Sequence, residues 1–136
     1  MNLMQNALTA HNNQIDGVLA PNDNTAGGII QALAQVGLAG KVPVTGQDAE
    51  VTAAQRIAQG TQSMTVFKDT RALAAKVAEM VSDIMQGKAP EVNDTKTYDN
   101  GVKVVPSYLL EPVFADVNNY KALLLDSGYY KEEELK

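Results

Sequence analysis

Three polar residues follow three short apolar segments, and their types suit hydrogen bonding to a polyhydroxylated ligand. Asn22 follows GVLAP, Asp48 follows VPVTGQ and Lys68 follows SMTVF. An amide both donates and accepts, a carboxylate accepts from two hydroxyls, and an ammonium donates. Because bonds to charged groups are about twice as strong as neutral ones, such a set can replace the hydration that a neutral ligand loses on burial.

Each of these residues also has a simpler interpretation. Asn and Asp after a strand are usually turn formers or helix caps, and Asp23 is expected to be such a cap. The recurrence at three matching positions leaves a shared ligand-binding site and three independent turns as comparable alternatives. Asp48 and Glu50 are close in sequence, but without a partner nucleophile or a metal-binding cluster they do not predict acid–base catalysis.

The elements that must position these residues alternate along the chain. Apolar periodicity and turn residues predict helices near residues 2–10, 25–36, 52–59, 70–85 and 119–127, and strands near 15–20, 41–45, 62–67 and 102–110. The alternation indicates an α/β fold with a mainly parallel sheet flanked by helices. Ligands bind beyond the carboxyl ends of such strands, so Asn22, Asp48 and Lys68 are expected at one edge.

The composition and net charge of the chain argue against several classes of function. The chain has 136 residues, of which 45% are hydrophobic and 20% charged, and its net charge is -5. It has no cysteine and one histidine, His11, which excludes thiolate metal sites and argues against a histidine metal cluster or a Ser-His-Asp triad. We therefore expect no metal, no cofactor and no enzyme activity. The negative charge argues against nucleic acid as a partner.

The length and the ends of the chain carry two further expectations. No apolar run approaches the roughly 18 residues that a membrane helix needs, and the N-terminus is not typical of a signal peptide. Three central strands are few for a complete doubly wound domain. We therefore expect the chain to be part of a larger α/β protein.

Three sequence runs resemble a known family. IDGVLAPNDNTAGGIIQAL, GKVPVTGQDAE and RIAQGTQSMTVFKD are similar to the C-terminal part of periplasmic sugar-binding proteins of the ribose/galactose type. The spacing from Asn22 to Asp48 to Lys68, with the KEEEL tail, resembles more narrowly the D-xylose-binding branch that serves ABC importers. There the matching Asn, Asp and Lys hydrogen-bond the sugar, so the resemblance implies a ligand-binding role for these three residues and no others.

The resemblance implies an incomplete fold. The family has two α/β lobes joined by three hinge crossings, with the sugar between them. Residues 1–68 would form the later part of the C-terminal sugar-binding lobe, residues 69–103 would pack on the absent N-terminal lobe, and residues 104–136 would form the return crossing and tail. We expect a second chain to supply the N-terminal portion. Alone, this chain should expose sheet edges and apolar helix faces, and be marginally stable or aggregate.

The function that the resemblance implies is monosaccharide binding, with D-xylose as the sugar and an ABC permease as the partner. The location would be periplasmic or extracellular, and the resemblance leaves open a lipid anchor on the missing N-terminus. The alternatives are the effector-binding domain of a sugar-responsive transcription regulator, a sugar-sensing partner of a membrane histidine kinase and, more weakly, a sugar-modifying enzyme. A signal peptide or lipid-attachment cysteine before Met1 would support transport, whereas a helix-turn-helix would support regulation.

Overall fold

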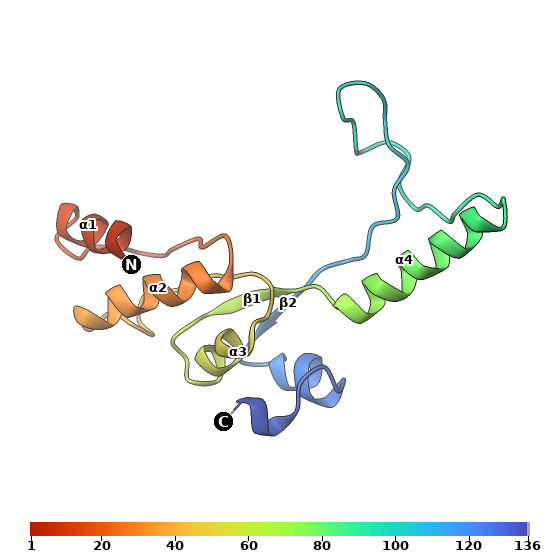
Figure 1. Ribbon diagram of the computed structural model, residues 1–136. Helices are drawn as coiled ribbons and strands as arrows, with labels where there is room; N and C mark the ends of the chain where they lie inside the picture. Colours follow the sequence, from red (N-terminus) through yellow and green to blue (C-terminus); the bar gives the residue numbers. More distant parts are fainter. Residues whose placement is uncertain (136) are drawn as a thin grey trace. The chain divides into compact units, whose positions relative to one another are not determined.

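The computed structural model describes residues 1–135, and the chain forms two compact units. Unit 1 contains residues 1–67 and the chain from Val113 onward, and unit 2 contains Lys68–Pro112. Lys136 lies outside the described residues. The elements are, in order, α1 (Asn2–Ala10), α2 (Asp23–Gln35), α3 (Val51–Ala58), β1 (Met64–Phe67), α4 (Thr70–Met85), β2 (Val113–Asp116), the π-helix η1 (Lys121–Asp126) and the 3-10 helix η2 (Glu132–Leu135) (Figure 1).

The helices of unit 1 begin and end at residues with identifiable roles. The Oδ1 atom of Asn22 accepts a hydrogen bond from the backbone N–H of Thr25 at 2.8 Å, so Asn22 caps α2. The prediction that Asp23 caps this helix is wrong, because Asp23 belongs to the helix and its side chain is buried. Gly37 and Gly60 follow α2 and α3 with φ values of 72° and 75°, as helix-ending glycines should.

The sheet of unit 1 combines parallel and antiparallel pairing. Val18 bridges Val44 and Gln47 bridges Val66, both in parallel. On its other edge β1 pairs with β2 in antiparallel register, with Phe67 opposite Val113. The predicted α/β arrangement with parallel neighbours is confirmed, and an antiparallel strand is added at one edge.

The segments at 15–20 and 41–45 are extended but do not form full strands. Side-chain oxygens replace backbone carbonyls as acceptors along them. Ala20 N–H donates to Thr45 Oγ1 at 3.1 Å, and Val44 N–H donates to Ser63 Oγ at 3.2 Å. Pro43 removes a further donor. The backbone ladder is therefore reduced to isolated bridges.

The strand predicted at 102–110 is wrong. The strand that follows α4 is β2, which begins directly after Pro112. Within 102–110 only isolated antiparallel bridges occur, from Asp99 to Val104 and from Asp94 to Ser107. Pro106 interrupts the run, because its nitrogen carries no hydrogen to donate to a ladder.

Unit 1 has two clusters of buried side chains. The first joins α1 and α2 to the extended segments, and its members are Met4, Leu8, Ala20, Ala26, Ile30, Ala32, Leu33, Val42 and Val44. The second joins the start of α3, β1 and the C-terminal segment, and its buried members are Ala49, Ala54, Phe67 and Leu124. Leu135 packs against this second cluster. Residues 131–135 are therefore tied to the core through η2.

Unit 2 is held mainly by polar contacts. Asp69 caps α4 by accepting from the N–H of Arg71, and α4 spans the residues predicted for it. Lys76 Nζ lies 3.0 Å from Glu91 Oε2 and 4.3 Å from the ring centroid of Tyr108. Asn93 pairs with Leu109, donating to its carbonyl at 2.9 Å and accepting from its N–H at 2.8 Å. The contacts of Lys76 join α4 to the segment that follows it, and the pair of Asn93 and Leu109 joins two parts of that segment to each other.

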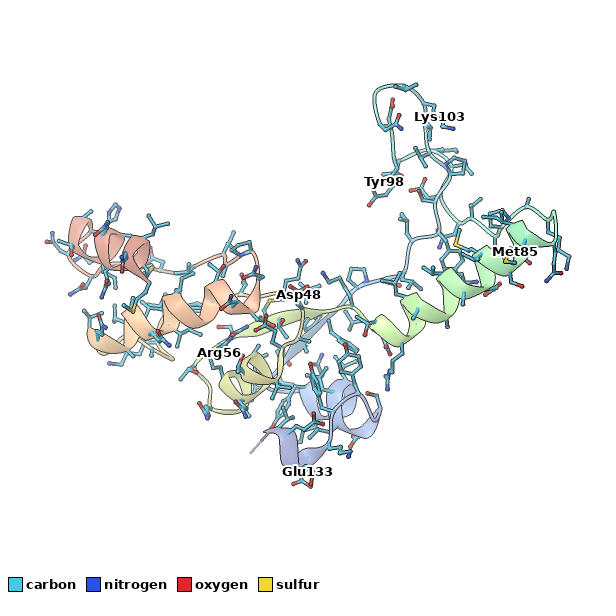
Figure 2. The ribbon with its side chains drawn as sticks, in the orientation of Figure 1. Asp48, Arg56, Met85, Tyr98, Lys103 and Glu133 are labelled. Carbon is cyan, nitrogen blue, oxygen red and sulfur yellow. The ribbon has the colours of Figure 1, made fainter. Side chains whose placement is uncertain are left out.

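The apolar stripe of α4 is exposed. None of its residues is buried, and the side chains that follow the helical period stand in solvent, with Leu73 52%, Val77 51%, Val81 49% and Ile84 61% exposed. Met85, at the end of the helix, is 83% exposed (Figure 2). The expectation that this chain exposes an apolar helix face is confirmed. No helix among the described residues has the length and apolar character to cross a membrane.

Two leucines test the difference between the buried apolar face of α2 and the exposed apolar face of α4. Leu33 on α2 is 0% exposed and Leu73 on α4 is 52% exposed. We expect Leu33→Ala to lower the free energy of unfolding of unit 1 by about 2–5 kcal/mol, because it leaves a cavity. Leu73→Ala should change stability by less than about 0.5 kcal/mol. Denaturant titration and amide hydrogen exchange on the 136-residue chain measure both, and equal losses would contradict the assignment of cores.

Candidate functional site

The segments that carry Asn22 and Asp48 lie side by side at one edge of unit 1. Asp23 N–H donates to the carbonyl of Gln47 at 2.9 Å, and Asp48 N–H donates to the carbonyl of Val66 at 2.9 Å. Since the three segments run parallel, this edge is the carboxyl edge of all of them. The structure thus brings together two of the residues that the sequence singled out.

Asn22 has a structural role that the simpler interpretation anticipated. Its carbonyl oxygen caps α2, and its side chain is half-buried. The amide nitrogen, which carries the two hydrogen-bond donors, takes no part in the cap. Asn22 is therefore able to cap the helix with one atom and to present donors at the edge with another.

Asp48 occupies an unusual backbone conformation. Its φ is 98° and that of Ala49 is 50°, values that non-glycine residues rarely adopt. Each such residue costs of order 1–3 kcal/mol and persists only where its surroundings fix it. The result is an exposed Asp48 side chain on a turn whose backbone is buried at Ala49 (Figure 2).

A buried carboxylate lies behind this turn. Asp23 is 0% exposed. Its Oδ2 accepts from Glu50 N–H at 2.9 Å and from Thr65 Oγ1 at 2.8 Å, and its Oδ1 accepts from Gln62 Nε2 at 2.8 Å. Asp23 also stands in the first turn of α2, where the helix dipole favours negative charge. These contacts satisfy the buried charge.

Arg56 completes this buried network. Its Nε donates to Gln62 Oε1 at 2.9 Å and its Nη2 donates to the backbone carbonyl of Asp23 at 2.8 Å. Burial lowers the pKa of Arg56, and the charges of Asp23 and Glu50 oppose that shift. Among the described residues, every buried side-chain nitrogen and oxygen has a hydrogen-bond partner. The network is thus complete.

The C-terminal segment also reaches the turn. Tyr130 donates its hydroxyl to the carbonyl of Ala49 at 2.9 Å. Its ring stands at 80° to that of Tyr129, which in turn meets the ring of Phe67 edge to face at 4.8 Å between centroids. Burial, and to a lesser degree the neighbouring Tyr129, raise the pKa of Tyr130. The hydroxyl therefore stays protonated and remains a donor at neutral pH.

Lys68 is the first residue of unit 2 and follows the last residue of β1 directly. It is exposed, and with Asp69, Leu73 and Tyr108 it lines a cavity of about 280 Å³ within that unit. Its participation with Asn22 and Asp48 in one site stays a prediction.

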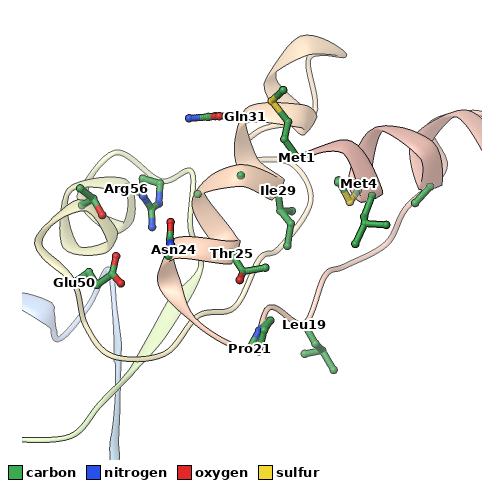
Figure 3. Close-up of a pocket in the computed structure, with 15 residues that line it drawn as sticks. Met1, Met4, Leu19, Pro21, Asn24, Thr25, Ile29, Gln31, Glu50 and Arg56 are labelled. Atoms are coloured by element: carbon green, nitrogen blue, oxygen red, sulfur yellow. The ribbon is translucent and has the colours of Figure 1, made fainter.

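A groove of about 810 Å³ lies elsewhere on unit 1. It runs along α1 and α2 to the start of α3, with Glu50 and Arg56 at one end and Met1 and Met4 at the other (Figure 3). Asn22 and Asp48 do not line it. No group of three or more His, Asp or Glu side chains in residues 1–135 is placed to hold a metal ion.

The sequence interpretation missed Asp23 as the centre of a buried network. A signal was present in QSMTVF, a predicted core strand that carries the polar residues Gln62 and Thr65. Polar side chains at buried positions require partners. An acidic residue at the end of the neighbouring segment, Asp23, is the natural partner for them.

Comparison with known proteins identifies the family to which this fold belongs. Residues 2–89 match the periplasmic binding protein domain. The chain belongs to this family. The family predicted from the three sequence runs is thereby confirmed.

Two curated relatives of this periplasmic binding protein domain match along almost its whole length. The multiple sugar-binding periplasmic receptor of Rhizobium radiobacter is 50% identical, over 98% of this chain and 39% of the relative. The D-xylose-binding periplasmic protein of Escherichia coli K12 is 48% identical, over 99% of this chain and 40% of the relative. The chain therefore spans about two fifths of the length of these relatives.

Solved structures of the family share the fold. An ABC transporter solute binding protein from Clostridium phytofermentans, with bound β-D-glucose, matches with a TM-score of 0.88 and 46% identity over 99% of this chain and 43% of that one. A carbohydrate transporter solute binding protein from Chloroflexus aurantiacus, in complex with D-glucose, matches with a TM-score of 0.86 and 40% identity, over 98% of this chain and 39% of that one. The two-unit structure of this periplasmic binding protein domain thus corresponds to part of a larger fold.

The packing of Gly46 against the buried network is open to test. A Cβ at this position would overlap Asp23 Oδ1 and Gln62 Nε2. We expect Gly46→Ala to lower the free energy of unfolding by about 1–3 kcal/mol, because the network must shift to admit a methyl group. Gly17→Ala is the matched control, since its Cβ would come no nearer than 3.8 Å to Pro43. Circular dichroism during denaturant titration compares the two, and similar midpoints would contradict the close packing.

Proposed function

We propose that this chain is the C-terminal part of the sugar-binding component of an ABC importer, and that Asn22, Asp48 and Lys68 hydrogen-bond a monosaccharide. The observation that carries the proposal is the carboxyl edge of unit 1, where Asn22 stands beside an exposed Asp48 held on a fixed turn. Relatives named as sugar-binding periplasmic proteins, at about half identity, support it.

The chemistry of the three side chains matches a sugar. The amide nitrogen of Asn22 donates to ring or hydroxyl oxygens, and the carboxylate of Asp48 accepts from hydroxyls. Lys68 adds a charged donor without needing an anionic ligand. We take D-xylose as the first candidate, because a D-xylose-binding protein is among the relatives, and we treat glucose as the main competitor, because two similar structures hold it.

The remaining surface fits a two-lobe arrangement. We propose that the exposed stripe of α4 is covered by an N-terminal lobe supplied by the rest of the protein or by a second chain. Closure of the lobes around the sugar would then be the signal that a permease recognises. The corresponding location is the periplasm, as for the named relatives. These relatives and structures favour this role over the effector domain of a transcription regulator or a sugar-modifying enzyme.

A thermal-shift panel of pentoses and hexoses tests the proposal in the two-lobe protein, assembled by supplying the N-terminal portion of the Rhizobium radiobacter relative. We expect a monosaccharide to raise the melting temperature, because binding to the folded state stabilises it by mass action. Asp48→Asn should weaken that sugar about 10- to 100-fold, since a charge-assisted bond becomes a neutral one. Asparagine tolerates the positive φ at this position.

Asp16→Asn provides the matched control. Asp16 is also exposed, but it precedes Val18 and so stands at the start of the extended segment that ends at Asn22, away from the carboxyl edge. Calorimetry should show an unchanged affinity for this variant. Failure of every sugar to shift the melting temperature of an assembled protein would rule out the proposal, and equal affinities for all three proteins would remove Asp48 from the site.

Asn22→Asp separates helix capping from sugar binding. Aspartate caps helices as well as asparagine does, so the free energy of unfolding should change by less than about 0.5 kcal/mol. The variant loses both amide donors, and the affinity for the sugar should fall by about tenfold, the cost of one lost hydrogen bond near 1.4 kcal/mol. Denaturant titration and calorimetry measure the two effects. A variant that binds normally would leave Asn22 as a cap alone.

A further inference from the structure

The turn that carries Asp48 is fixed at every successive residue. The carbonyl of Gln47 accepts from Asp23 N–H, and Asp48 N–H donates to Val66, each at 2.9 Å. Ala49 N–H donates to Thr65 Oγ1 at 3.1 Å. Glu50 N–H donates to Asp23 Oδ2, and the Ala49 carbonyl accepts from the hydroxyl of Tyr130, each at 2.9 Å. Hydrogen bonds of this turn therefore run to α2, to β1 and to the C-terminal segment.

These hydrogen bonds compensate for the unfavourable backbone conformation of the turn. Asp48 and Ala49 both have positive φ although neither is glycine. Such conformations persist where surrounding contacts over-determine them. If the contacts were lost, the turn would relax toward negative φ and the direction of the Asp48 side chain would change with it.

Thr65 is at the centre of the pinning contacts. It is 0% exposed, and its hydroxyl donates to Asp23 Oδ2 at 2.8 Å while accepting from Ala49 N–H at 3.1 Å. Because the carboxylate of Asp23 can only accept, it fixes the direction of the hydroxyl hydrogen. The lone pairs of Thr65 are thereby left for Ala49, and Asp23 reaches the adjoining Glu50 N–H directly.

We propose that Thr65 and Asp23 are positioning residues for sugar binding, which hold Asp48 in the orientation that grips the ligand. The inference rests on the proposed function for its readout in affinity, but the pinning of the turn is tested without any ligand. Neither residue is expected to touch the sugar, since both side chains are fully buried behind the turn.

The first arm of the test uses the assembled two-lobe protein without any sugar. Thr65→Val keeps the shape of the side chain and removes the hydroxyl. Amide hydrogen exchange at Ala49 and Glu50 should accelerate at least about fivefold, the equivalent of one hydrogen bond. Thr65→Ser restores the hydroxyl and should restore slow exchange. Thr61→Val is the matched control, because the Thr61 hydroxyl bonds the carbonyl of Arg56 in the same unit and does not contact the turn.

The second arm measures sugar affinity in the assembled two-lobe protein. Thr65→Val should weaken binding about fivefold or more, Thr65→Ser should bind normally, and Thr61→Val should have no effect. In an Asp48→Asn background the loss caused by Thr65→Val should shrink toward nothing, because Thr65 acts through Asp48. A purely structural role would produce additive losses instead.

The outcomes separate the two proposals. Exchange at Ala49 and Glu50 that is no faster in Thr65→Val than in Thr61→Val overturns the positioning role. Faster exchange with undiminished affinity, or with additive losses, overturns it as well. The positioning role is supported if exchange is fast in Thr65→Val and slow again in Thr65→Ser, and if the losses of affinity in Thr65→Val and Asp48→Asn are not additive. An unsubstituted assembled protein that binds no sugar overturns the proposed function, and the exchange arm then still decides whether Thr65 fixes the turn.

Discussion

One fully buried carboxylate organises the carboxyl edge of unit 1. Removing Asp23 from water is costly unless its charge is compensated, and breaking such a compensated site is strongly destabilising. Its donors come from different parts of the chain: Thr65 from β1, Gln62 from the residues just before it, and the backbone of Glu50 from the start of α3. The requirement to satisfy a single charge thus fixes how these segments approach one another.

The consequence of this constraint is a rigid turn on an exposed edge. In the proposed site, the carboxylate of Asp48 has to be oriented before the ligand arrives, because ordering it on binding would reduce affinity. Asp48 is exposed, yet the backbone on both sides of it is bonded to buried groups. Gly46 allows the turn to approach the buried carboxylate, since any side chain there would collide with it. The same network therefore stabilises the buried side of the turn and fixes the backbone that carries the exposed Asp48 side chain.

The parts of the structure that were predictable from the sequence are those governed by local chemistry. The bounds of α4 follow from its cap at Asp69 and its 3.6-residue period, and α2 and α3 are followed by Gly37 and Gly60, whose positive φ suits glycine. The prediction of a strand near 102–110 is wrong because strand pairing is non-local and because Pro106 cannot donate to a ladder. Asp23 was misassigned because a cap and a buried charge look alike in sequence: both are short acidic residues at the start of a helix.

Apolar periodicity identifies a helix face that requires a partner, but it does not identify the partner. The buried faces of α1 and α2 meet within unit 1, where Met4, Leu8 and Leu33 are all in the core. The equally regular stripe of α4 stays in solvent, and unit 2 is held instead by contacts such as those of Lys76 with Glu91 and Tyr108. Polar contacts of this kind are worth little at an exposed surface, so they hold the unit together without replacing a core. The chain spans about two fifths of the length of its relatives. In the proposed two-lobe protein, unit 1 buries its apolar side chains internally and carries part of the binding edge. Unit 2 exposes the apolar stripe of α4, on which the other lobe would pack.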